Sequence, residues 1–240
     1  MAQHITRKEL KKDQIREGFV HGAEAVASHQ QQIWIYGALA LIVVLAVLGW
    51  RFYTQTQTAR GSAALADAMT VYQARIRAPN DAAAPGEITY VDQKNKFTDA
   101  AKKFTDVANR YSHTRPGQVA RYYAALSLEQ IDRNDEAEKD FQTVESGGDE
   151  GLTALARFQL AQIYDKTGKA AQAVKLYQQL ADKPNLFVPK AVVLLALADH
   201  YSTTDPAQAV KLYNQVKSEF PDSAAAQEAD ERLQLLPVKS

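Results

Sequence analysis

The sequence has no cysteine, few glycines and no net charge, and each of these absences excludes a class of function. Without cysteine there are no disulfides, no thiolate nucleophile and no cysteine ligand for a metal. Such a chain suits an oxidising compartment, although many cytosolic proteins also lack cysteine. The 28 basic and 28 acidic residues cancel, so the chain has no electrostatic footprint for nucleic acid.

Catalytic motifs are also scarce, and the eleven glycines leave little room for loop-borne chemistry. None of the five histidines has the spacing of a zinc-protease motif. Gly147-Gly148 lacks the Lys-Ser/Thr of a phosphate loop and predicts a turn between helices. His200 beside Asp199 fits a base with an orienting acid or a polar pair lining a groove, and a repeat helix favours the groove pair. The sequence predicts a protein that is not an enzyme, with no cofactor, metal or small-molecule substrate.

The longest apolar run is residues 33–50, IWIYGALALIVVLAVLGW, which contains no charge. As a helix it covers roughly 27 Å, close to the hydrocarbon thickness of a bilayer. A core helix of a soluble protein is the alternative, and the aromatic residues at both ends favour a membrane helix. The residues expected at the two lipid–water boundaries are Trp34, Tyr36, Trp50, Arg51 and Tyr53.

The flanks of this run predict an uncleaved signal anchor. The exit after Trp50 is bulky, and a lead-in of about thirty residues is long for a cleaved signal peptide. The leading tail carries five basic and four acidic residues before residue 33, a weak bias that predicts a cytoplasmic tail. Residues 61–240, with 21 basic and 24 acidic residues, are then expected to face the periplasm or the exterior. The tail also has a loose apolar stripe, which fits either a helix on the inner leaflet or a solvated segment.

The second main feature is an internal repeat. Residues 171–179 (AQAVKLYQQ) and 207–215 (AQAVKLYNQ) are identical at eight of nine positions, 36 residues apart. The small and aromatic positions recur toward the N-terminus at Ala137 and Phe141 and at Ala100 and Phe104. Each unit predicts two short amphipathic helices, which must stack on neighbours to bury their apolar stripes. A non-repeating helical bundle is the alternative that the identity disfavours.

These patterns predict an all-α protein: a single transmembrane helix followed by an α-solenoid of helical hairpins. The expected divisions are a cytoplasmic tail over 1–32, a transmembrane anchor over 33–53, a connecting helix and linker over 54–96, and a repeat domain over 97–240. The connecting helix is expected at 61–77, and a capping helix at 223–236 closes the stack. Asp205 and Pro206 predict an N-cap and a first helical residue.

The repeat pattern resembles tetratricopeptide repeats. The residues that carry the resemblance are Tyr164, Ala173 and Tyr177 in one unit and Ala209, Tyr213 and Pro221 in the last. The usual early tryptophan is missing and Ala161 stands where glycine is common, which leaves the packing angles open. The resemblance implies a scaffold that binds proteins on a concave face lined by the first helix of each hairpin.

On this resemblance, the outward positions of the first helices would bind a partner. These positions are Tyr122, Leu126 and Glu129, then Phe158, Gln162 and Asp165, and finally Leu195, Asp199 and Ser202. A mixed aromatic and acidic groove suits an extended polypeptide or a partner's helix. The alternative is that Tyr122, Phe158 and Leu195 are packed between helices.

The order of parts also resembles the ancillary subunit of the bacterial Sec translocon. A tail, a span ending in LGWRFY (48–53), a small-residue helix and then repeats carry this resemblance. It implies a single-pass protein of the bacterial inner membrane, with its C-terminal domain in the periplasm. It also implies translocon subunits, a membrane-anchored periplasmic chaperone and exported polypeptides as partners. The ending FPDSAAAQEADERLQLL (220–236) resembles envelope repeat proteins that coordinate outer-membrane constriction. A scaffold for cell-wall or outer-membrane machinery is therefore the alternative.

Overall fold

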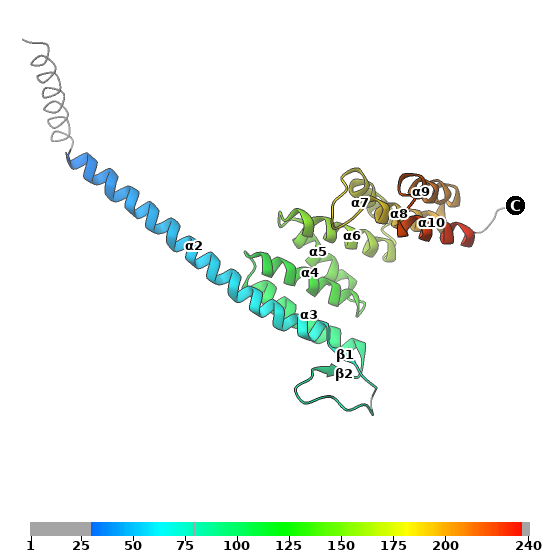
Figure 1. Ribbon diagram of the computed structural model, residues 1–240, viewed down its shortest axis with the longest axis horizontal. Coiled ribbons are helices and arrows are strands. Elements are labelled where there is room, and N and C mark those ends of the chain that lie inside the picture. The colour runs from blue at the N-terminus through cyan, green and yellow to red at the C-terminus, as the bar shows by residue number, and fades with distance from the viewer. Residues whose placement is uncertain (1–29, 79, 237–240) are drawn as a thin grey trace, which may run out of the picture. The chain divides into compact units, whose positions relative to one another are not determined.

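A computed structural model describes residues 30–78 and 80–236 of the chain, and side chains from residue 34 onward. The predicted cytoplasmic tail and its apolar stripe lie almost wholly outside the described residues. The chain divides into two units, residues 1–56 and 57–240. Within the described ranges the helices run from α2 to α10, with one pair of two-residue strands (Figure 1).

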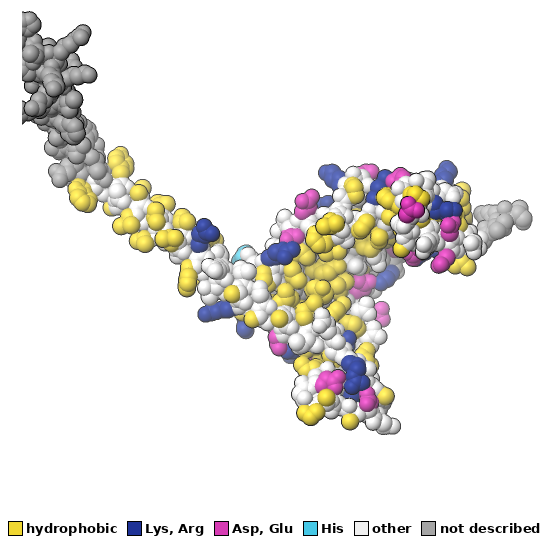
Figure 2. Space-filling view, in the orientation of Figure 1, with side chains coloured by type: hydrophobic (Ala, Val, Ile, Leu, Met, Phe, Trp, Pro, Cys, Tyr) yellow, Lys and Arg dark blue, Asp and Glu magenta, His cyan; other side chains and the backbone are white. Residues whose placement is uncertain are grey.

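Helix α2, Gln30–Tyr72, contains the apolar run and is long and apolar enough to cross a membrane. None of its most apolar stretch is buried, and Figure 2 shows hydrophobic side chains along it. The five predicted boundary residues are all exposed: Trp34, Tyr36, Trp50, Arg51 and Tyr53. A signal sequence has the same length and composition, so the structure defines a segment of membrane-spanning length and no more.

The expected separate helix at 61–77 was wrong in both of its ends. Residues 61–72 continue α2, and the helix stops at Tyr72. Arg75–Ile76 instead form strand β1, which pairs in parallel with β2, Thr89–Tyr90. Each strand contains one β-branched residue, Ile76 in β1 and Thr89 in β2, and such residues favour the extended backbone that this pairing requires.

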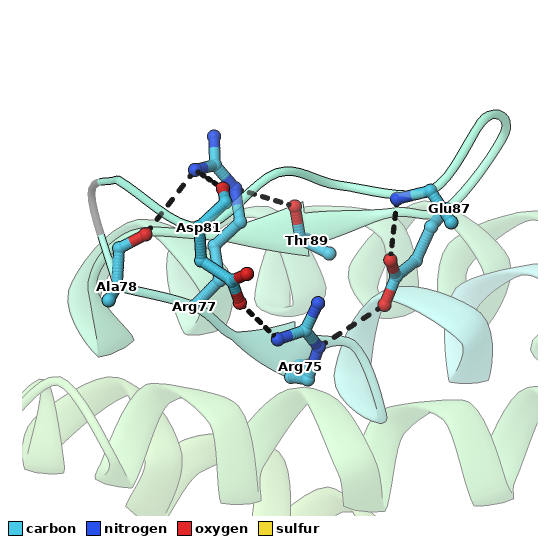
Figure 3. Close-up of polar contacts among 7 residues, drawn as sticks. Arg75, Arg77, Ala78, Asp81, Glu87 and Thr89 are labelled. Carbon is cyan, nitrogen blue, oxygen red and sulfur yellow. Dashed lines mark hydrogen bonds and ion pairs between the residues drawn. The ribbon is translucent and has the colours of Figure 1, made fainter.

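The segment between the two strands was expected as a linker, and two arginines order it (Figure 3). Arg75 contacts Asp81 at 2.6 Å and Glu87 at 3.3 Å. Arg77 donates to the Thr89 hydroxyl at 3.1 Å and to the Asp81 carbonyl at 2.7 Å. The amide of residue 84 and then Arg75 lower the pKa of Glu87, since both stabilise its carboxylate.

The remaining helices form hairpins that stack in sequence order. They are α3 (Gln93–Arg110), α4 (Arg115–Glu129), α5 (Asn134–Glu145), α6 (Glu150–Lys166), α7 (Ala170–Asp182), α8 (Lys190–Thr204), α9 (Pro206–Glu219) and α10 (Ala224–Leu235). The predicted cap at Asp205 is confirmed, because its side chain accepts from the Gln208 amide at 3.1 Å. Such a cap contributes about 1 kcal/mol.

The small and aromatic positions of the repeat fill the core, as the sequence predicted. Ala137, Ala173 and Ala209 are fully buried, and the aromatic ring four residues later in each helix is at most 1% exposed. Alanine lets the two helices of a hairpin approach closely, and the ring fills the space beside the crossing. Gly168, with φ 76°, makes the tight turn between α6 and α7.

The first hairpin of the stack uses the end of α2 as its first helix. Ala68 and Val71 are buried with Phe104 of α3 in one cluster. The ring of Tyr72 lies 5.6 Å from that of Phe97 and 5.4 Å from that of Tyr123. We call the second compact part of the chain, residues 57–240, the repeat unit. It begins at residue 57, whereas the sequence predicted that the repeat domain begins at residue 97.

Candidate protein-binding groove

Two adjoining hollows lie on the last hairpins of the stack. The first, ≈ 520 Å³, is lined by α6, α7 and α8. The second, ≈ 830 Å³, is lined by α8, α9 and α10. They share Asp199, Thr203 and Thr204, so we treat them as one groove across three consecutive units.

Three acid–base pairs connect the successive first helices of the stack, and we call them the acid–base ladder. They are Glu129 of α4 with Lys166 of α6, Asp165 of α6 with His200 of α8, and Asp199 of α8 with Arg232 of α10. In every rung the acid comes first and the base follows about one repeat later. The ladder therefore gives each of the three acids that the sequence predicted as partner-binding residues a partner from within the chain, a cation for Glu129 and Asp199 and an imidazole ring for Asp165.

Asp165 is held from two directions in the first hollow. His200 Nδ1 lies 2.5 Å from Asp165 Oδ1, and the Tyr177 hydroxyl donates to Oδ2 over 3.3 Å. Burial, followed by the nearby Asp165 charge, raises the pKa of Tyr177. This tyrosine therefore stays a neutral donor at any physiological pH.

Asp199 has the same arrangement one unit later. The Tyr213 hydroxyl donates to Asp199 Oδ1 over 2.6 Å, and Arg232 contacts Oδ2. Burial, and then Glu228, raise the pKa of Tyr213. His200 and Asp199 thus both line the groove but have different partners, and the arrangement of a base with its adjacent acid is not formed.

Two apolar residues of the predicted binding face, Leu126 and Phe158, lie outside the two hollows. Leu126 and Phe158 are half-buried against the core, and the Phe158 ring meets Tyr177 edge-on at 6.1 Å. Figure 2 shows hydrophobic side chains gathered over the middle of the repeat unit. The predicted binding face therefore combines apolar contacts at Leu126 and Phe158 with the internally paired polar groups of the two hollows.

Two of the predicted partner-binding residues belong to the core. Tyr122 is 8% exposed, with its ring against Phe141 at 5.6 Å, and Leu195 is 5% exposed. For both, the alternative of packing between helices applies, because their side chains lie inside the stack. The other seven are partly exposed: Leu126, Glu129, Phe158, Gln162, Asp165, Asp199 and Ser202. Their part in binding stays a prediction.

Several groove residues escaped the sequence reasoning. Arg232, Leu235 and Leu236 come from the capping helix and its end, which was expected only to cover the stack. His200 was noticed, but with the wrong partner. A search for acidic residues followed about one repeat later by lysine, arginine or histidine would have identified all three rungs, because neighbouring first helices place such residues side by side.

The stacked hairpins and the lined groove define a helical-repeat protein of the kind that interacts with other proteins. The model of the tetratricopeptide repeat-like domain family matches residues 30–187, and the chain belongs to this family. A tetratricopeptide repeat model also matches residues 191–223. No curated protein matches the sequence. The family confirms the predicted repeats and implies protein–protein interaction in general.

Proposed function

We propose that this protein is a membrane-anchored scaffold whose repeat unit holds polypeptide segments in the groove. The apolar part of α2 is the uncleaved anchor, with the N-terminus in the cytoplasm and the repeat unit in the periplasm of a bacterium. One observation supports the proposal above all: the same chain contains a charge-free run of membrane-spanning length and a repeat unit with a groove. The family match begins at residue 30, so it includes the apolar run.

The chemistry of the groove supports an extended polypeptide as its occupant. The acid–base ladder already gives each groove acid a partner within the chain, with cations at Glu129 and Asp199, so a strongly basic partner gains little from these two carboxylates. The hydroxyls of Ser202 and Thr204 on the lining donate to carbonyls of α8 at 2.6 Å and 3.3 Å. Their oxygens can still accept from main-chain amides of a peptide. A peptide of mixed sequence fits such a surface better than a nucleic acid or a small molecule does.

Among polypeptide partners, we propose components of the Sec translocon, a periplasmic chaperone and the chains being exported. The order of span, small-residue helix and repeats supports this assignment. Binding and not catalysis is the role that the groove favours. Among residues 30–78 and 80–236, no group of three or more histidine and carboxylate side chains is placed to hold a metal ion.

The alternative is a scaffold for cell-wall or outer-membrane machinery. The feature that favours it is the C-terminal end, because α10 supplies Arg232, Leu235 and Leu236 to the second hollow. Fluorescent fusions distinguish the two roles. A translocon partner predicts an even membrane distribution, whereas a division-linked scaffold predicts focusing at mid-cell or the poles.

Photocrosslinking in intact membranes tests the leading proposal. A photoreactive amino acid at Gln162 or Thr203, both on the groove lining, should capture translocon subunits or exported chains. The matched control is Gln178, an exposed residue of α7 outside the lining. Equal capture from the groove and from Gln178 would reject the groove as the binding surface. Protease added to spheroplasts should digest the repeat unit, and its survival would reject the orientation.

A further inference from the structure

The loops that join one hairpin to the next lie along a single edge of the repeat unit, which we call the loop edge. Its members are residues 111–114, 146–149, 183–189 and 220–223. Ion pairs join the first loop to the second, Arg115 with Asp149 at 2.9 Å, and the third to the fourth, Lys190 with Glu219 at 2.7 Å. Between the second and third, the Phe187 ring lies against Gly151. The edge is therefore a continuous surface built from four consecutive connections.

The chain enters the repeat unit at this same edge. Gly61 of α2 lies against the first loop, where an added Cβ would be 3.2 Å from the Tyr111 ring and 3.4 Å from Thr114 and Pro116. Tyr72, at the end of α2, packs far from this loop, among Phe97 and the rings of the first hairpin. The loop edge is thus the edge of the repeat unit at which α2 arrives.

One connection on the loop edge exposes large apolar side chains. In the loop between α7 and α8, Leu186 is 89% exposed and Phe187 is 57% exposed. Val188 points inward at 3% exposure, and the Asn185 side chain accepts from the Phe187 amide at 2.8 Å. The loop is therefore anchored at its base, presents Leu186 outward at its tip, and holds the half-exposed Phe187 ring against Gly151 of α6, where an added Cβ would lie 2.7 Å from the ring.

We propose that Leu186 and Phe187 insert into the bilayer that holds the apolar run of α2, as a second contact of the repeat unit with lipid. The proposal rests on the membrane anchor proposed above. A tip of two residues is far smaller than the roughly 1,000 Å² that a specific protein interface needs. A fluid apolar phase needs no complementary pocket, and the tether keeps the tip at high effective concentration near it.

The charges of the loop edge indicate an apolar contact and not an electrostatic one. Positive residues on or beside it are Arg110, Arg115, Lys183 and Lys190, and negative ones are Glu145, Asp149, Glu150, Asp182, Glu219 and Asp222. Such a mixture gives no net attraction to anionic lipid. Insertion should therefore occur equally in zwitterionic vesicles and should persist at high salt.

The absence of cysteine makes a direct test simple, because a single introduced cysteine can carry an environment-sensitive fluorophore. We would label the full chain at Leu186→Cys, in phosphatidylcholine vesicles containing lipid with a nitroxide near the headgroup. Leu45→Cys reports on the apolar run, and Ala171→Cys reports on an exposed site beside the turn at the opposite edge. The expected result is several-fold stronger quenching at position 186 than at position 171, abolished when Phe187→Ser is added.

Each contrary outcome has a distinct meaning. Quenching at 186 no stronger than at 171, with strong quenching at 45, overturns the second lipid contact and leaves the anchor intact. A lack of quenching at 45 overturns the anchor and, with it, this inference. A blue shift at 186 without quenching shows burial against protein, which also overturns lipid insertion.

Discussion

Removing the Tyr213 hydroxyl should destabilise the end of the stack by an amount that the geometry lets us work out. The substitution Tyr213→Phe keeps the buried ring and deletes only the donor to Asp199 Oδ1, at 2.6 Å. A hydrogen bond to a charged group contributes about 1.5 to 3 kcal/mol. Asp199 has 37% of its side chain exposed, so we expect about 1 to 2 kcal/mol after allowing for solvent screening.

The other partner of Asp199 should matter less. In Asp199→Asn the amide oxygen still accepts from Tyr213, while the ion pair with Arg232 is lost. Both members of that pair are more than a third exposed, so its loss should cost only about 0.5 to 1 kcal/mol. Asp199→Ala removes both contacts and should cost about 2 to 3 kcal/mol.

Urea unfolding of the full chain in mild detergent, followed by circular dichroism, measures these differences. Tyr177→Phe is the matched control, because its hydroxyl lies 3.3 Å from the Asp165 carboxylate, a longer bond. It should cost less than Tyr213→Phe. The reasoning fails if the two tyrosine variants are equally stable, or if Tyr213→Phe and Asp199→Ala add without coupling in a double-mutant cycle.

Three further predictions concern the rest of the repeat unit. Gly117→Ala should prevent stable packing of the first two hairpins, since the new Cβ would lie 2.0 Å from the Tyr111 carbonyl oxygen; thermal unfolding measures the loss. Phe141→Ala, at a fully buried ring, should cost about 3 to 5 kcal/mol in urea unfolding, and a loss below 1 kcal/mol would contradict the core assignment. The pKa of Asp149 is lowered by the backbone amides at the start of α6 and by Arg115, so its contribution is present above about pH 4 and is lost as the pH falls through the folded-state pKa. Asp149→Asn should therefore flatten the loss of stability on acidification, as measured by urea titrations from pH 6 to pH 3.

Sequence reasoning recovered the features that depend on local pattern. An alanine and an aromatic ring four residues apart on one helix face predict a crossing and its filler, and Ala173 with Tyr177 do occupy those places. The cap at Asp205 was also predictable, because an N-cap depends only on the next three residues.

The errors arose where the structure depends on distant partners. Strand β1 has two residues, and it forms only because β2 lies beside it after a loop that Arg75 and Arg77 hold closed. The last turns of α2 were predicted to be a connecting helix because the loop between β1 and β2 separates them in the sequence from the helix on which they pack. Only the packing of Val71 with Phe104 shows that they begin the first hairpin.

The candidate site was predictable in its location but not in its pairing. The first helices were expected to supply the lining, and Gln162, Asp165 and Asp199 do lie on it. Their exposure depends on helix rotation within the stack, which buries Leu195 and leaves Asp199 partly exposed. The groove acids are paired with basic side chains or histidine on the next first helix instead of being free. These partners lie about one repeat later in the sequence, so local patterns around each acid do not reveal them.

The acid–base ladder has a consequence for where the chain can be shortened. Its last rung joins α8 to α10, so truncation after residue 222 would leave Asp199 without Arg232. The second hollow, which α10 helps to line, would then be open to water. Glu129 and Asp165 would keep their partners in such a molecule. The loss of stability caused by truncation should therefore be confined to the final hairpin. If it extends to earlier hairpins, its extent would measure how strongly neighbouring hairpins are coupled.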